Sequence, residues 1–357
     1  MKFELIRPRD LDTCLMKSWH QIQYEDPMLR HPFLSPGFTQ AVAAVRDDVE
    51  IAVLETDGEV VGFFPFQRSR ANAGQPAGGP LSNAHGVVLR PGVAIDGRDL
   101  LRACGLKSWK FHLVMAEQVA FRPYHHVVDE NFYMDLSSGF EAYEQSRLAT
   151  GSQSYRTVLR KDRKLKREMD SVKFEFHTED TAVFDQLIAW KREQCQEKKA
   201  VDTFSVEWTI NLLRQILDNP TDHLRAVLSV LYINDEPSAV SCDLVADNIA
   251  DTWIPAYGEL HAKYSPGTVL LRERCKVYAE TGIAKVYLGT PGLRWKDTFR
   301  SASDPFASGS IEAGLLSQVA KRSISQSLAW ARDSPLRGPG RVAKQAVRRL
   351  LEHYTLR

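Results

Sequence analysis

The sequence predicts an α/β (α+β) protein made of two related domains, each a mixed twisted sheet flanked by helices. Two hairpin patterns favour this fold: residues 51–66 contain two strand-like runs around Asp57-Gly58, and residues 228–244 repeat the design around Asn234-Asp235. In each half a strand and a helix-patterned stretch come first, at residues 3–22 and 172–197. The shared order of elements indicates a duplicated architecture.

The most informative segment is residues 250–289, which read as a strand, a helix and a second strand. Residues 252–257 form the first strand. Ser265-Pro266 supplies the N-cap and first residue of the helix, and Gly282 ends it. Residues 284–288 then form a largely buried strand. On the helix, one face is apolar (Leu271, Cys275, Tyr278, Ala279) and the other charged (Arg272, Glu273, Arg274, Lys276, Glu280).

The start of this helix predicts an anion site. The amides of Gly267, Thr268 and Val269 are expected to point outward without intrahelical acceptors. Together with the helix dipole they suit a phosphate group. An ordinary capped helix is the alternative, because Ser-Pro is a common helix start.

Composition sets limits on the class of protein. The chain has 357 residues and a formal net charge of +1, which gives no strong global attraction to nucleic acid. Its five cysteines are scattered without metal-ligand spacing, so we expect reduced thiols and no metal. The N-terminus lacks an apolar signal region, and no apolar run approaches the ~20 residues of a membrane span. These features predict a soluble, cytoplasmic protein.

Loops and linkers suggest the domain limits. We predict an N-terminal domain at 1–145, a C-terminal domain at 146–332 and a basic amphipathic tail at 333–357. The stretch 69–86 is rich in Gly, Ala, Asn and Pro, so a functional or mobile loop is expected there. Pro237 lies inside a predicted strand, which favours an edge or a bulge at that point.

Six segments, in order from about His31 to Phe299, resemble the CelD/BcsL group of GNAT-type acetyltransferases, which is associated with cellulose and exopolysaccharide synthesis. They are HPFLSPGFTQAVAA, DGEVVGFFPFQR, AGGPLSNAHGVV, SYRTVLRKDRKLKRE, AYGELHAKYSPGTVLLRE and YLGTPGLRWKDTF. The group is also similar to the FemABX transferases, whose tandem GNAT-like domains add aminoacyl groups to peptidoglycan precursors. The resemblance implies tandem GNAT-like domains and acyl transfer from a thioester, acetyl-CoA or another acyl-CoA, to an amine or hydroxyl.

The resemblance also assigns a donor-binding loop. In typical GNAT enzymes, a loop of pattern Gln/Arg-x-x-Gly-x-Gly/Ala binds the CoA pyrophosphate. The corresponding stretch here, 261–268, contains only Gly267, and Pro266 removes one amide donor. The expected binding residues are therefore Ser265, Gly267 and Thr268, with Lys263 as counter-charge.

Candidate reacting groups follow from the same resemblance. Lys296, after Trp295, matches a family lysine and would stabilise charge on acceptor, phosphate or thiolate. Tyr257, or less favourably Tyr287, would protonate the departing thiolate. Asp243 or Asp251, on the central strands, would act as base, as would His85 in the glycine-rich segment. Each also fits a structural interpretation: a surface lysine, core tyrosines, solvent-facing carboxylates and a hydrogen-bonding loop histidine.

Two basic segments suggest partners. Residues 156–167 hold seven cations, five of which form one helical stripe suited to phosphates of a nucleotide-sugar, lipid carrier or RNA: Arg156, Arg160, Arg163, Lys164 and Arg167. A solvated helix face is the alternative. The tail carries Arg341, Lys344, Arg348 and Arg349 beside apolar residues, so it would contact an anionic membrane or dock on the core.

The predicted function is therefore acyl transfer to a sugar or polysaccharide precursor, with a saccharide or small-molecule acceptor and a polysaccharide synthase complex as partners. We do not expect a nucleic-acid partner. Two alternatives remain: an aminoacyl-tRNA-dependent ligase of the FemABX kind, and a non-catalytic scaffold of a synthase complex.

Overall fold

The structure, a computed structural model, describes residues 1–314 and consists of two compact units. Unit 1 contains residues 1–129, 199–212 and 305–314, and unit 2 contains Glu130–Lys198 and Leu213–Asp304. Two strands carry the chain between the units, β7 (His125–Asp135) and β13 (Ala302–Glu312). The predicted boundary after residue 145 therefore falls inside unit 2, within helix α4 (Phe140–Ala149). The predicted tail, 333–357, lies outside the described residues.

The sheet of unit 1 follows the predicted hairpin plan. Its order is β1 (Lys2–Ile6), β2 (Val49–Thr56), β3 (Glu59–Arg68), β4 (Ala73–Pro76), β6 (Ser108–Met115) and β13, with β5 (Val88–Leu89) also paired to β3. Between β2 and β3, Asp57 and Gly58 both have positive φ, 54° and 83°. That backbone is the two-residue turn that the Asp-Gly pair predicts.

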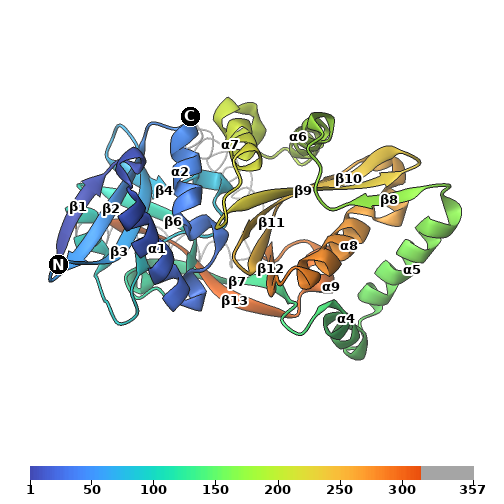
Figure 1. Cartoon of the computed structure of the whole chain (residues 1–357), viewed down its shortest axis with the longest axis horizontal. Helices are drawn as coiled ribbons and strands as arrows, with labels where there is room; N and C mark the ends of the chain where they lie inside the picture. Colours follow the sequence, from blue (N-terminus) through green and yellow to red (C-terminus); the bar gives the residue numbers. More distant parts are fainter. Residues whose placement is uncertain (315–357) are drawn as a thin grey trace, which may run out of the picture. The chain divides into compact units, whose positions relative to one another are not determined.

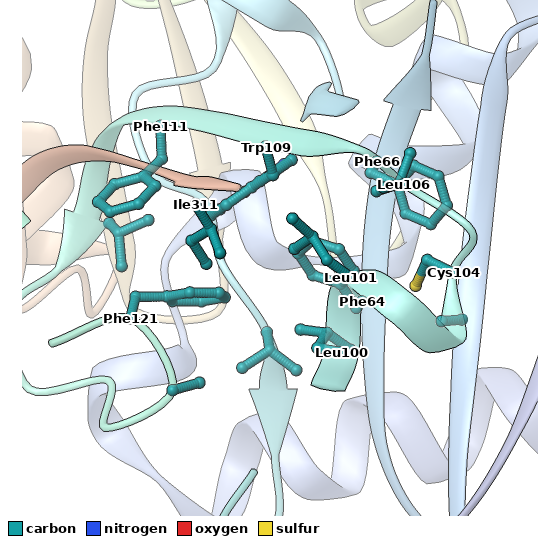
Figure 2. Packing of buried hydrophobic residues seen from close by; sticks show 14 of the residues in the cluster. Phe64, Phe66, Leu100, Leu101, Cys104, Leu106, Trp109, Phe111, Phe121 and Ile311 are labelled. Carbon is teal, nitrogen blue, oxygen red and sulfur yellow. The ribbon is translucent and has the colours of Figure 1, made fainter. Parts of the chain in front are cut away.

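Unit 1 also contains helices α1 (Thr13–Glu25), α2 (Pro36–Val45) and α3 (Gly97–Ala103). Its core is strongly aromatic (Figure 2). Trp109 lies against Phe64, Phe111 and Phe121, with ring centroids 4.9–5.2 Å apart. Ile311 of β13 packs in the same cluster, so the returning strand completes this core.

The glycine-rich stretch 69–86, which we predicted to be a functional or mobile loop, contains regular structure. It contains β4 and a short 3-10 helix (Gly79–Leu81), and much of it is buried. The amide of Gly78 donates to Gln67 Oε1 at 2.9 Å, and Ser82 Oγ donates to the carbonyl of Ala84 at 2.9 Å. Small residues therefore let this segment pack inside unit 1.

The sheet of unit 2 has the order β7, β12 (Lys285–Gly289), β11 (Ile249–Tyr257), β10 (Glu236–Ala246), β9 (Arg225–Ile233) and β8 (Val172–Glu175). All neighbours are antiparallel except β11 and β12. The turn from β9 to β10 has positive φ at both Asn234 and Asp235, and the ladder shifts register between Pro237 and Ala239. Both predictions, the turn and the bulge, are confirmed.

The helices of unit 2 cover this sheet. They are α4, α5 (Gln153–Glu168), α6 (Thr181–Glu197), α8 (Pro266–Glu280) and α9 (Arg294–Phe299), while α7 (Glu207–Asp218) is divided between the units. Helices α6 and α8 lie on opposite sides of the strands (Figure 1). The apolar face of α8, with Leu271 and Cys275, packs on Ala250 and Val286 as its periodicity predicts. A mixed α/β fold is thus confirmed.

Candidate active site

The two parallel strands β11 and β12 stay together for only three residues. Ile249 pairs with Lys285, Ala250 with Val286 and Asp251 with Tyr287. Beyond Asp251, β11 continues to Tyr257 beside β10, whereas β12 ends at Gly289. Within the described part of the chain, the far edge of β11 from Thr252 onward therefore has no strand partner. We call this feature the strand divergence.

Lys296 lies at the strand divergence. Its Nζ donates to the carbonyl of Thr290 at 3.0 Å. Gly289 leaves room for it: this residue has φ +85°, and a Cβ there would lie 2.9 Å from Lys296 Nζ. Burial lowers the pKa of Lys296, and the nearby Lys191 lowers it further, while Asp251 acts in the opposite direction. Lys296 thus lies among opposed charges.

Lys191, on α6, is a second cation here that the sequence did not single out. Its Nζ lies 3.4 Å from the carbonyl oxygen of Pro255 on β11. Burial lowers the pKa of Lys191 as well. Only the position of α6 over β11 reveals this residue, because nothing in the local sequence distinguishes it from the other lysines of the helix.

The structure separates the two candidate carboxylates. Asp251 is buried, and it is the last residue of β11 that pairs with β12. It lies close enough to Lys296 and Tyr287 to affect the pKa of both. Asp243 instead faces α8: its carboxylate accepts from Arg274 Nη1 at 2.7 Å, Ser241 Oγ at 2.7 Å and Tyr278 OH at 3.0 Å. Asp243 is fully buried, and burial raises its pKa while Arg274 opposes that rise.

Asp243 has a structural role, because it accepts three hydrogen bonds and is fully buried. Our prediction placed Arg274 on the charged outer face of the helix, and that prediction is wrong. Arg274 is 1% exposed and also donates to Thr252 Oγ1 at 3.0 Å, so it joins α8 to β10 and β11. Hydrophobic periodicity sorts residues by polarity alone, so it cannot identify an arginine that lies on a predominantly apolar helix face.

The two tyrosines also differ. Tyr287 is 4% exposed and its hydroxyl donates to Asp304 Oδ2, which also accepts from Lys285 Nζ at 2.9 Å. Burial and the charge of Asp304 raise the pKa of Tyr287. Tyr257 is 46% exposed, at the end of β11, and its ring lies beside Gly267, where an added Cβ would be 3.6 Å from Tyr257 Cδ1. Tyr257 therefore lies against the start of α8.

At that helix start, Ser265 does not act as a conventional N-cap. Its backbone is left-handed (φ 56°, ψ 57°) and its side chain makes no capping bond. The amide of Thr268 donates to the carbonyl of Ser265 at 2.9 Å and that of Val269 to the same oxygen at 3.4 Å, so these donors are not free as predicted. The amide of Gly267 has no acceptor among the described residues.

The counter-charge at this point comes from α5. Lys161 Nζ donates to Ser265 Oγ at 2.7 Å, whereas the predicted Lys263 is exposed and lies over the ring of Tyr264, 4.8 Å from its centroid. Lys161 belongs to the basic run but falls outside the stripe that helical spacing selects. Sequence reasoning missed it because the stripe was chosen by helical spacing alone, and Lys161 lies on the flank that meets η7 (Glu259–Tyr264).

His85 belongs to unit 1, whereas the other nine candidate site residues belong to unit 2. It is 5% exposed, and its Nε2 accepts the backbone N–H groups of His112 and Leu113, each at 3.1 Å. The proton therefore lies on Nδ1. Burial lowers the pKa of His85 well below its usual value, and the neighbouring His112 and His31 add to this. Its geometry is that of a structural acceptor for two amides.

Residues 152–297 match the family model described as acetyltransferase (GNAT) domain. Most of this stretch belongs to unit 2, and residues 199–212 within it belong to unit 1. No curated protein shows significant similarity to the chain.

Solved structures show the same fold over most of the chain. FemX has a TM-score of 0.57 at 9% identity, covering 90% of this chain and 99% of that one. A tandem GNAT protein from the clavulanic acid biosynthesis pathway has a TM-score of 0.50 at 11% identity, with 88% and 99% covered. At such identities the likeness concerns the fold alone. The chain thus contains a region that matches an acetyltransferase (GNAT) domain, within a fold like that of FemX and of a tandem GNAT protein.

The matched region contains α5, the strand divergence, α8 and Lys296. It therefore includes Asp251, which the sequence already offered as a base, and Lys161, which the structure adds, and it excludes His85. Among residues 1–314, no group of three or more His, Cys, Asp or Glu residues is placed to hold a metal ion. None of the helices within those residues has both the length and the apolar character needed to cross a bilayer.

Proposed function

We propose that the chain transfers an acyl group from an acyl-CoA, most simply acetyl-CoA, to an amino or hydroxyl group of a sugar or polysaccharide precursor. The observation that supports the donor is the strand divergence, with Lys296 at one end and the Lys161–Ser265 contact at the other. Among the described residues, β11 pairs with no strand on the β12 side beyond Asp251, so this edge offers backbone groups to an extended amide-bearing arm, as in strand addition.

The phosphate end of the donor fits the start of α8. Lys161 Nζ, Ser265 Oγ and the amide of Gly267 converge there, and the helix dipole adds partial positive charge. Thr268 contributes through the shape of the first turn, since its amide and hydroxyl both bond to the carbonyl of Ser265. Lys263, which is exposed nearby, would add long-range attraction only.

This placement sets the roles of the other candidates. Because Tyr257 lies against Gly267, at the opposite end of β11 from Asp251, it would lie away from the thioester, which would lie further along β11 toward Asp251. The acceptor nitrogen or oxygen would attack the thioester carbon and lose its proton toward Asp251. The carbon–sulfur bond would break, and the departing thiolate would be stabilised by the ammonium of Lys296. We therefore favour Asp251 over Asp243 as the base and Lys296 over Tyr257 as the group facing sulfur.

The sugar acceptor rests on the resemblance to the CelD/BcsL group, whose members are associated with exopolysaccharide synthesis. A contact with a polysaccharide synthase complex, or with a membrane through the segment 333–357, is part of the same proposal. That segment lies outside the described residues.

The test is a calorimetric titration of the full chain with acetyl-CoA, CoA and dephospho-CoA. We expect acetyl-CoA to bind and Lys161→Met to weaken it by on the order of tenfold, as expected for one charge-assisted contact. Arg163→Met, an exposed cation on the same helix, is the matched control and should change little. Absence of acyl-CoA binding by the folded protein would refute the proposal and favour the scaffold alternative.

One observation favours a second donor, a charged tRNA. The cations Arg156, Arg160, Arg163 and Lys164 are exposed along α5 beside Lys161, which is a surface that phosphates can contact. Binding of aminoacyl-tRNA with a steep salt dependence, in the absence of acyl-CoA binding, would establish this alternative.

A further inference from the structure

We infer that unit 2 holds a positively charged ammonium group of the acceptor, distinct from the group that reacts, in a cavity between α6 and the end of β11. This inference rests on the proposed function, since it concerns the acceptor of the same domain. The cavity is lined by Trp190 and Tyr257 and by the carboxylates of Glu193, Glu197 and Glu259, with Gln194 and Lys198 completing the wall.

The two aromatic rings are fixed by neighbouring glycines. A Cβ on Gly258 would lie 2.8 Å from Trp190 Cζ2, so only glycine lets the indole lie against the strand end. The backbone of Gly258 is extended (φ −85°, ψ 153°), and its amide continues the ladder to the carbonyl of Ser238 at 3.1 Å. The packing of Trp190 therefore requires the absence of a side chain at Gly258, not the conformational freedom of a glycine backbone. Tyr257 lies opposite, beside Gly267.

Three exposed carboxylates outnumber the cations at this cavity. Glu193, Glu197 and Glu259 take part in no ion pair among residues 1–314, and Lys198 is the single cation of the wall. An excess of negative charge against two aromatic walls is the chemistry that recognises an ammonium group.

The aromatic faces are also unused. Many cations of the described chain stack on rings, for example Arg300 on Phe132 and Lys285 on Tyr133, but none lies over Trp190 or Tyr257. Both rings line the cavity instead. Cation–π attraction and charge attraction thus act in the same direction at one point.

The chemistry of the two ends of β11 is complementary. Near the strand divergence the two cations Lys296 and Lys191 outnumber the carboxylate of Asp251, and like charges disfavour the protonated form of an amine. The net charge there therefore favours a neutral, nucleophilic amine. At the other end of β11, the carboxylates around Tyr257 favour a protonated amine, because a nearby opposite charge stabilises the charged form. An acceptor with two separated amino groups would therefore be held by one and react through the other.

The test uses choline and its neutral isostere 3,3-dimethylbutan-1-ol, titrated into the full chain and followed by ligand-observed NMR. We expect choline to bind at least fivefold more tightly, and Glu193→Gln/Glu197→Gln to reduce its affinity by on the order of tenfold. Glu280→Gln, at the opposite end of α8, is the matched control for loss of one surface carboxylate and should leave the affinity unchanged.

A second variant separates the cavity from general surface charge. Gly258→Ala keeps the backbone conformation and all charges but displaces the indole of Trp190, so choline binding should fall about fivefold while the salt dependence persists. Equal binding of choline and its neutral isostere, or no binding of choline to the folded protein, would overturn the inference. Acetyl-CoA binding measured on the same samples distinguishes failure of this cavity from failure of the donor proposal.

Discussion

The two units start from one plan and fill it differently. Both contain a hairpin closed by a two-residue turn of positive φ, β2–β3 in unit 1 and β9–β10 in unit 2. Unit 1 fills its interior with aromatic rings around Trp109. Unit 2 buries charges on both sides of its sheet: Asp243 and Arg274 toward α8, and Asp251 toward α6 with Lys191 and Lys296 near it.

The difference teaches where chemistry can arise in a duplicated fold. In unit 1 the buried His85, whose ring lies beside Trp109, accepts two backbone amides. In unit 2 two parallel strands separate after three residue pairs, and charged side chains gather where the pairing ends. Backbone groups left unpaired and desolvated charges are costly in a core, and functional sites are where proteins retain such costs.

The largest effect should come from breaking the buried ion pair of unit 2. Arg274→Met leaves the Asp243 carboxylate fully buried without its cation, so the free energy of unfolding should fall by ~3–5 kcal/mol. Denaturant titration followed by circular dichroism measures it. The double variant Asp243→Leu/Arg274→Met removes both charges and should recover most of the loss. Equal destabilisation by the single and double variants would show that packing, not charge, dominates here.

A second effect concerns the lysine at the strand divergence. Lys296→Met should lower kcat/KM by about 10²–10³, the usual result of removing one group that stabilises developing charge. Thiol release from acetyl-CoA in the presence of an amino-sugar acceptor measures the rate. Arg294→Met, an exposed residue of the same short helix, is the matched control.

The pH profile distinguishes catalysis by Lys296 from support of the fold. The ammonium form is the stabilising one, and burial lowers its pKa from the ordinary 10.5. The rate should therefore fall as pH rises through that lowered value, and Lys296→Arg should move the fall to higher pH. An unchanged profile in the arginine variant would rule out this role.

The sequence predicted elements well and tertiary partners poorly. Hairpins, the βαβ unit and the bulge at Pro237 follow from local turn chemistry and periodicity, which act within a few residues. Asp243 and Asp251 cannot be separated in that way, since only the sheet shows that one faces α8 and the other the strand divergence. Lys161 and Lys191 were missed because each reaches its partner, Ser265 or Pro255, from a helix distant in sequence.

The smallest predicted effect tests the histidine of unit 1. Burial holds the pKa of His85 well below 6.5 in the folded state, His112 and His31 lower it further, and Nε2 accepts the amides of His112 and Leu113. The unfolded chain binds a proton near pH 6.5, so the stabilisation is fully present above that value and is lost as pH falls below it. Between pH 8 and pH 5 the loss from this residue should be at most about 2 kcal/mol, the limit that the unfolded-state pKa sets.

Unfolding free energies measured from pH 5 to pH 8 on the parent chain and on His85→Gln check this. Glutamine keeps an acceptor for the amides but does not titrate, so the variant should be less stable at pH 8 and show a flatter acid slope. Parallel slopes for the two proteins would mean that other groups, such as the buried His31, govern the acid response. A flatter slope would show that unit 1 holds its polar core residue uncharged for the fold, whereas unit 2 retains charged residues at the strand divergence.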